Sequence, residues 1–185
     1  MGFSILTEQD SIVVVIDIQQ RLLTVMPEYT GESVVKQTDI LLQAASEINI
    51  PLLITEQYPK GLGTTVETLQ PYVSVTNRIE KTCFSCADAD GFMSSLRSSH
   101  KRQVILVGME AHICILQTAL ALQTQGYQVF VVEDAVCSRT QKNQDNAMQR
   151  LQQAGVTITN TESVLFEWLG DAKHSAFRTL SKLIV

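Results

Sequence analysis

The sequence predicts an α/β fold in which a doubly wound parallel sheet lies between two layers of helices, a three-layer αβα arrangement. Strand-like and helix-like segments alternate about six times along the chain, with no linker or repeat between them. The strand-like runs are short and almost wholly apolar, which is typical of parallel strands buried on both faces. The length of 185 residues fits one domain, so we expect residues 1–185 to form a single domain.

The first half of the chain supplies three expected strands and one long helix. A β-branched run at Ser11–Ile18 predicts the first buried strand. Apolar residues at helical spacing predict a helix over Thr30–Ile48. A second buried strand is expected at Pro51–Thr55 and a short third strand at Val73–Thr76. The intervening segment Gln57–Thr65 contains one proline and two glycines, so we expect a loop there.

The second half of the chain continues the alternation. The expected strands are Gln103–Gly108, Tyr127–Glu133 and Val156–Thr159. The expected helices are Asp90–His100, Ala111–Gln125, Asn143–Ala154, Glu162–Leu169 and His174–Leu183. Gly126 and Gly155 directly follow two of these helices, at the position where glycine commonly ends a helix.

Composition and charge exclude several classes of protein. A chain that is 45% hydrophobic and 18% charged can bury enough apolar surface to avoid disorder. The formal charge of −5 argues against a nucleic-acid-binding surface, which is normally basic. No apolar run approaches the roughly 20 residues that span a bilayer, and no secretion signal precedes the first strand. We therefore expect a protein of the cytoplasm or an organelle matrix that binds neither membranes nor nucleic acid.

Three polar residues are candidates for chemistry, because doubly wound sheets bind ligands beyond the carboxyl ends of their strands. Asp17 ends the first apolar run, where a carboxylate is either a helix cap or a buried base. Cys114 follows a strand by a short turn and opens an apolar helix, whose dipole and free N–H groups would lower the thiol pKa. A free cysteine in such a place is also commonly a small core residue. Lys81 follows the short third strand, and its position alone carries no weight.

The remaining cysteines give weaker signals. Cys83 and Cys86 have the C-x-x-C spacing of redox motifs and zinc half-sites. They follow a polar segment, however, and no histidine is grouped with them at the usual ligand spacing. We expect both to line or pack beside Lys81 and Cys137 to be a core residue, and we predict no metal site.

Five sequence blocks in order resemble the isochorismatase-like cysteine hydrolase superfamily, within it the isochorismatase-domain-containing and YcaC-type proteins. The blocks are VVVIDIQ (13–19), TEQYPKGLG (55–63), EKTCFS (80–85), VGMEAHICILQTA (107–119) and VVEDAVCSR (131–139). The resemblance implies a six-stranded parallel sheet and a Cys–Asp–Lys triad, with Cys114 as nucleophile, Asp17 as general base and Lys81 stabilising the thiolate. It also implies a cis peptide bond at Glu110–Ala111 and an oxyanion hole built from the N–H groups of Ala111 and Cys114.

The sequence also departs from patterns found in this superfamily. Its nicotinamidases carry an Asp-x-His metal element after the second strand, where this chain has Thr55, Glu56 and Gln57. Ala111 and Leu22 stand where threonine and phenylalanine are common. A zinc-dependent nicotinamidase is therefore disfavoured, whereas the hydrolase class stays open as to substrate.

The prediction is accordingly a metal-independent cysteine hydrolase without a cofactor, acting on a small amide, ester or related substrate through a thioester-like intermediate. The alternative is a catalytically inactive homo-oligomeric scaffold or partner-binding protein, favoured by the apolar C-terminal segment with Phe177 and Leu180. A nuclease is disfavoured by the acidic balance. Members of the superfamily are commonly oligomeric, so we expect a homo-oligomer.

Five further residues are candidate substrate contacts. Gln19 lies just beyond the expected base, and Tyr58 lies in the loop after the second strand. Phe84 lies beyond the lysine, and Glu110 and His112 lie in the turn before the nucleophile. His112 is two residues from the cysteine, so the two do not share a helix face, and we expect it to line the pocket or cap the helix.

Overall fold

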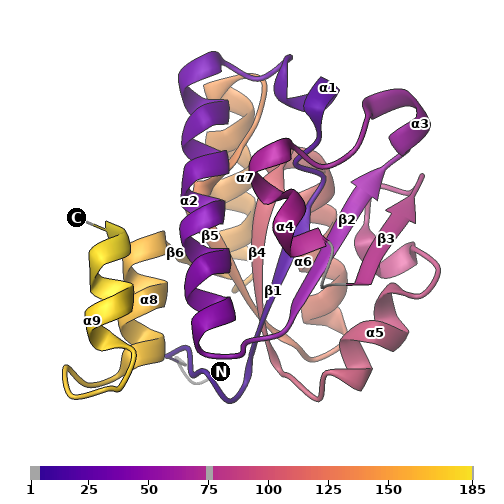
Figure 1. The fold of residues 1–185 in the computed structure, drawn as a ribbon. Helices are drawn as coiled ribbons and strands as arrows, with labels where there is room; N and C mark the ends of the chain where they lie inside the picture. The colour runs from indigo at the N-terminus through magenta and orange to yellow at the C-terminus, as the bar shows by residue number, and fades with distance from the viewer. Residues whose placement is uncertain (1–4, 74–76, 185) are drawn as a thin grey trace.

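The computed structural model describes residues 5–73 and 77–184, and within them six strands form one sheet between two helical layers (Figure 1). The strand order is β3-β2-β1-β4-β5-β6, and every neighbouring pair is parallel. The strands are β1 (Ser11–Ile16), β2 (Leu52–Gln57), β3 (Asn77–Lys81), β4 (Gln103–Met109), β5 (Gln128–Cys137) and β6 (Thr157–Thr159). The predicted three-layer fold with a six-stranded parallel sheet is confirmed.

Helices cover both faces of the sheet. One face carries α2 (Glu28–Glu47), α8 (Thr161–Leu169) and α9 (Phe177–Leu180) (Figure 1). The other face carries α5 (Phe92–Ser98), α6 (Leu116–Thr124) and α7 (Gln141–Gln153). Short helices in the connections are α1 (Gln20–Leu23), α3 (Pro59–Leu62) and α4 (Gln70–Val73), with single turns at Glu67–Leu69, Cys86–Asp88 and Ser181–Ile184. Within the described ranges, none of these helices combines the length and apolar character needed to cross a membrane.

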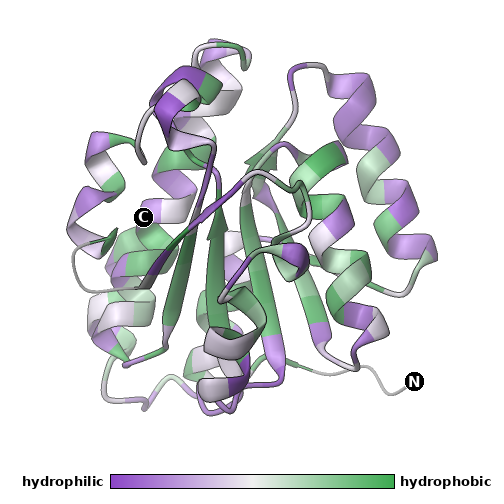
Figure 2. Ribbon diagram, turned by 90° about the vertical axis from the view of Figure 1, so that its right-hand side faces the viewer, coloured by the Kyte–Doolittle hydropathy of each residue, from purple (hydrophilic) through white to green (hydrophobic). Residues whose placement is uncertain are grey.

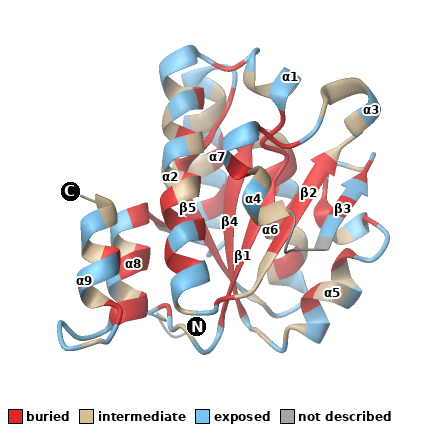
Figure 3. Ribbon diagram, viewed as in Figure 1, coloured by how far each residue is buried: buried red, intermediate tan, exposed pale blue. Residues whose placement is uncertain are grey.

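The core lies on the two faces of the central strands. Every residue of β1 and β4 is buried, and Figures 2 and 3 show apolar, buried strands between helices of mixed polarity. Val13 and Val15 pack in the layer with α2, whereas Val14 packs in the layer with α6. This alternation is what helices on both faces require, and each fully buried Val or Leu contributes about 1.5–3 kcal/mol of burial free energy.

Two expected strands in the first half end or begin elsewhere. Strand β1 stops at Ile16 because Asp17 has a φ of +56°, which takes the chain out of the extended conformation. The strand expected at Val73–Thr76 is wrong at Val73, which ends α4, and residues 74–76 lie outside the described residues. The third strand is β3 instead, so Lys81 is the last residue of a strand and does not follow one.

Three further segments differ from the expectation. The helix expected from Ala111 begins with a π-helical turn, η3 (Ala111–Ile115), before α6. The loop expected over 57–65 contains the short helix α3, and β5 runs on to Cys137 past a register shift against β4. The closing helix expected over His174–Leu183 is reduced to α9 and a single 3-10 turn.

Candidate active site

The three candidate catalytic residues meet at the carboxyl edge of the sheet. Asp17 directly follows β1, Lys81 ends β3, and Cys114 follows β4 by one short turn. The strand order reverses between β1 and β4, and ligands of doubly wound folds bind at such a switch point. The topology therefore places these residues where a small molecule would be expected to bind.

Asp17 and Lys81 form a buried ion pair. Lys81 Nζ lies 2.6 Å from Asp17 Oδ2, and both side chains are 0% exposed. The other carboxylate oxygen, Oδ1, accepts a hydrogen bond of 2.7 Å from the hydroxyl of Thr55. Removing two charges from water is costly unless they are paired and hydrogen-bonded, and both conditions hold for this carboxylate.

Lys81 bridges the carboxylate and the thiol. Besides Asp17, its Nζ donates to Gln57 Oε1 at 2.6 Å and reaches Cys114 Sγ at 3.8 Å, with two backbone carbonyls at 3.3 and 3.4 Å. Burial by itself lowers the pKa of Lys81, but the negative charge of Asp17 and its hydrogen bond to the ammonium help to outweigh this effect and hold the pKa above its usual value. The side chain is therefore an ammonium at neutral pH.

Cys114 lies in the π-helical turn and is 6% exposed. Burial raises the pKa of its thiol, the negative charge of Asp17 raises it further, and Lys81 opposes both. The expectation of a lowered thiol pKa is therefore wrong, because desolvation and the adjacent carboxylate outweigh the helix terminus. The resting sulfur is a thiol and needs a base before it can act as a nucleophile.

The turn before Cys114 has an unusual backbone. The cis peptide bond is Met109–Glu110, one residue before the expected Glu110–Ala111. The carbonyl of Glu110 accepts hydrogen bonds from Ile113 and Ile115, the residues on either side of Cys114. Ala111 is fully buried in this turn. The oxyanion hole expected from Ala111 and Cys114 stays a prediction.

Two side chains of this turn are anchored to the segment after β5. The buried carboxylate of Glu110 pairs with Arg139 at 2.6 Å and also accepts the Arg139 backbone N–H at 3.0 Å. Burial alone raises the pKa of Glu110, but these bonds lower it overall. His112 Nδ1 lies 2.9 Å from Ser138 Oγ, and His112 Nε2 lies 3.3 Å from Asn143 Nδ2. Both predicted substrate contacts are thus engaged within the protein.

The other predicted contacts divide into one buried residue and two exposed ones. The side-chain amide of Gln19 is fully buried and bonds the backbone of Gln57 and Gly63, so it holds the 57–63 segment. Tyr58 and Phe84 are about half exposed, at 55% and 53%. Tyr58 lines a pocket of about 390 Å³ with Lys81 and other residues of this edge. Its role and that of Phe84 stay predictions.

Sequence reasoning missed two side chains that contact the ion pair. Thr55 and Gln57 lie at the end of β2 and bond Asp17 and Lys81 directly. The available signal was their position at a strand end, beside the candidate residues. Cys86, which the sequence analysis expects beside Lys81, is fully buried, and its Sγ lies 3.8 Å from Thr55 Oγ1. Among the described residues, no three His, Cys, Asp or Glu side chains are grouped to share a metal ion.

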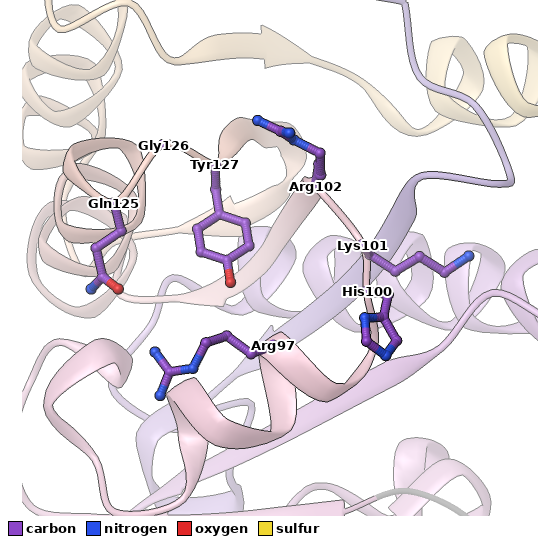
Figure 4. A pocket seen from close by; sticks show the side chains of 7 residues that line it. All are labelled: Arg97, His100, Lys101, Arg102, Gln125, Gly126 and Tyr127. Carbon is purple, nitrogen blue, oxygen red and sulfur yellow. The ribbon is translucent and has the colours of Figure 1, made fainter.

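A separate pocket of about 450 Å³ lies at the opposite, amino-terminal edge of the sheet (Figure 4). It is formed by the segments that precede β4 and β5, and its basic residues are Arg97, His100, Lys101 and Arg102. Figure 4 shows these side chains pointing in different directions. None of the candidate catalytic residues lines this pocket.

Comparison with known proteins gives one consistent family. The profile of the isochorismatase domain matches residues 11–163. The chain is 40% identical to isochorismatase domain-containing protein 2 of Danio rerio, covering 99% of this chain and 91% of that protein. It is 34% identical to the secreted isochorismatase effector Isc1 of Phytophthora sojae, covering 97% of this chain and 86% of that protein.

Solved structures with the same fold include two with different descriptions. The MAR1 ribonuclease of Caenorhabditis elegans has a TM-score of 0.89 and 33% identity, covering 98% of this chain and 92% of that one. The YcaC protein of Escherichia coli, described as an octameric hydrolase of unknown specificity, has a TM-score of 0.90 and 24% identity. That match covers 100% of this chain and 91% of the other.

Proposed function

The chain belongs to the isochorismatase family, and from that premise we propose that it is a metal-independent cysteine hydrolase of small amides, esters or related compounds. Cys114 is the proposed nucleophile, Asp17 the general base and Lys81 the cation that stabilises the thiolate. The observation that carries the proposal is the position of Lys81 Nζ, which contacts Asp17 Oδ2 at 2.6 Å and Cys114 Sγ at 3.8 Å.

In the first half of the proposed reaction, Asp17 takes the proton of the Cys114 thiol as the sulfur attacks the substrate's carbonyl carbon. A carbon–sulfur bond forms, and the carbonyl oxygen becomes an oxyanion, for which the N–H groups of Ala111 and Cys114 are the proposed donors. When the tetrahedral intermediate collapses, Asp17 returns its proton to the departing amine or alcohol. The acyl group stays on Cys114 as a thioester.

In the second half, water replaces the leaving group. Asp17 takes a proton from the attacking water, the carbon–sulfur bond breaks, and the thiolate recovers its proton from Asp17. The raised pKa of the thiol supports a mechanism with a base, since a resting thiolate would need none. Lys81 stays paired throughout, because both the carboxylate and the sulfur lie within its reach.

Thiol labelling followed by intact-protein and peptide mass spectrometry tests the proposal. With iodoacetamide at neutral pH, Cys114 should react faster than Cys137, a fully buried thiol whose pKa is raised to about 12 by burial and by Glu110. In a panel of small amides and esters, Cys114→Ala should abolish turnover and Cys137→Ala should preserve it. Equal labelling of the two thiols, or turnover by Cys114→Ala, would contradict the assignment.

The inactive scaffold is the alternative proposal, and its support is the apolar surface near the C-terminus. Phe166 on α8 is 42% exposed and its ring contacts that of Phe177 on α9, with 6.3 Å between centroids. A homo-oligomer would cover such a surface. No turnover across the panel, together with a defined oligomer in light scattering, would favour the scaffold, whereas a monomer would count against it.

RNA cleavage is a third activity to test, because the worm relative is described as a ribonuclease. The basic pocket of Figure 4 precedes β4, whereas Cys114 follows it, so the strand separates them by about 20 Å. An RNA phosphate bound at that pocket would lie far from the proposed nucleophile. A cytoplasmic location stays a prediction, and one relative is described as a secreted effector.

A further inference from the structure

The threonine and the glutamine at the end of β2 each lie against one member of the buried ion pair. Thr55 is aligned with Ile16 in the sheet, so it lies beside the residue that follows Ile16, and its hydroxyl donates to Asp17 Oδ1 at 2.7 Å. Gln57 is aligned with Lys81 across β2 and β3, and its Oε1 accepts from Nζ at 2.6 Å. The register of three neighbouring strands therefore produces both contacts.

Cys86 sets the direction of the Thr55 hydroxyl. Burial and then the charge of Asp17 raise the pKa of the Cys86 thiol to about 12, so it is protonated at neutral pH. Its Sγ donates to Thr55 Oγ1 at 3.8 Å, which leaves the proton of that hydroxyl for Asp17. The backbone N–H of Cys86 is in turn held by Thr118 Oγ1 at 2.9 Å.

Both groups of the ion pair are restricted in different ways by these contacts. The carboxylate of Asp17 has one oxygen held by Thr55 and the other by Lys81, so it cannot rotate without losing a charge-assisted hydrogen bond. The ammonium of Lys81 has three protons, and Asp17 and Gln57 take the two shortest contacts. The third proton faces the remaining neighbours, among them Cys114 Sγ.

We propose that Thr55 and Gln57 are positioning residues, which hold Asp17 and Lys81 so that both act on the thiol of Cys114. This inference deepens the proposed hydrolase function and rests on it. Without the Thr55 hydroxyl, the carboxylate of Asp17 is free to turn. Its negative charge, which lies beside the thiol, also loses a hydrogen-bond donor. Without the Gln57 carbonyl, the ammonium loses one of its two shortest acceptors.

The test measures the rate of iodoacetamide labelling of each cysteine in the full-length protein. Thr55→Val removes the hydroxyl but keeps the branched shape, Thr55→Ser keeps the hydroxyl, and Gln57→Met removes only the amide. The matched control is Thr38→Val, because Thr38 is a fully buried threonine on α2 whose hydroxyl has no partner among the described residues. Urea unfolding of each variant reports whether it is folded.

Thr55→Val and Gln57→Met should each slow labelling of Cys114 by about tenfold or more, as expected for loss of a hydrogen bond to a charged group. Thr55→Ser should restore the wild-type rate, and Thr38→Val should leave it unchanged. A purely structural role predicts the opposite, because a loosened fold would expose and speed the labelling of Cys114 and Cys137 together. Unchanged or faster labelling of Cys114 in Thr55→Val overturns the inference. If Thr55→Val does not fold, Gln57→Met provides the same test, because Gln57 is only half-buried.

The two proposals fail in different ways. If Cys114 in the wild-type protein reacts no faster than Cys137, the proposed nucleophile is wrong whatever the variants do. If wild-type Cys114 reacts fast and stays fast in both Thr55→Val and Gln57→Met, the nucleophile stands and only the positioning role is lost.

Discussion

Replacing Lys81 with methionine removes the cation from a site that holds a buried carboxylate. Methionine has a similar length and no charge, so it fills the space of the lysine stem. The carboxylate of Asp17, which is 0% exposed, then lacks its cationic partner and keeps the Thr55 hydroxyl as a donor at 2.7 Å. Breaking one side of a buried ion pair leaves an uncompensated charge, which costs about 3–5 kcal/mol.

Urea denaturation at pH 7 measures this loss. With a cost of about 4 kcal/mol and a slope of about 2–3 kcal/mol/M, the unfolding midpoint of Lys81→Met should fall by about 1.3–2 M. The double variant with Asp17→Asn should recover much of the loss, because no charge is then left buried. The coupling energy between Lys81 and Asp17, measured by this double-mutant cycle, should therefore exceed about 2 kcal/mol.

The matched control is Glu80→Gln, which breaks the neighbouring ion pair with Arg78 on the same strand. That pair is exposed, at 42% and 53% of the two side chains, so the cost should be about 0–1 kcal/mol. If Lys81→Met costs no more than Glu80→Gln, or if the two substitutions at Lys81 and Asp17 are additive, the pair does not stabilise the fold as inferred.

Two further predictions concern the turn that carries the nucleophile. Arg139→Gln should lower stability at pH 7 by about 1–2 kcal/mol, a modest cost because Arg139 is 54% exposed. The pKa of Glu110 is lowered in the folded protein. The loss of stability in Arg139→Gln should therefore be present above the unfolded pKa of Glu110, about 4.3, and should vanish as the pH falls through the folded pKa. Urea midpoints of the wild type and the variant at pH 7 and pH 3 check this. Gly108→Ala should cost about 3 kcal/mol or more, since a Cβ at φ +120° would lie 2.0 Å from the carbonyl oxygen of Ile16. Gly126→Ala, at φ +87° with open space around it, should cost about 1–2 kcal/mol. Urea unfolding of the two glycine variants measures both costs, and equal costs would contradict the steric argument.

The alternation of apolar runs predicted the layers of the fold because parallel strands buried on both faces have few alternatives. The third strand was misplaced for a physical reason. Strand β3 lies at the edge of the sheet. Of its side chains whose burial is described, Ile79 and Lys81 are buried and the other two are exposed. Its sequence therefore lacks the continuous apolar run that marks β1. The end of β1 was also invisible, because Ile18 continues the apolar pattern past the positive φ of Asp17.

The sequence could identify only those site residues that follow a recognisable apolar strand. Asp17 and Cys114 follow conspicuous apolar strands, whereas Lys81 was selected through the resemblance. Thr55 was missed because threonine is a common strand residue, and its contact with Asp17 depends on the register of β2 against β1. A local pattern carries no information on register between strands that lie about 40 residues apart.

The charge balance of the site explains why the proposed base and cation are buried together. In the proposed proton transfer, a site with a carboxylate, an ammonium and a neutral thiol becomes one with a carboxylic acid, the same ammonium and a thiolate. The net charge in the buried volume is the same in both states, so moving the proton from Cys114 to Asp17 adds no charge that must be desolvated. Lys81 contacts both positions of the negative charge, at 2.6 and 3.8 Å, and therefore needs no large movement to follow it. Without the lysine, the carboxylate would repel the negative charge that develops on the sulfur. Without the carboxylate, the thiol proton would have no acceptor.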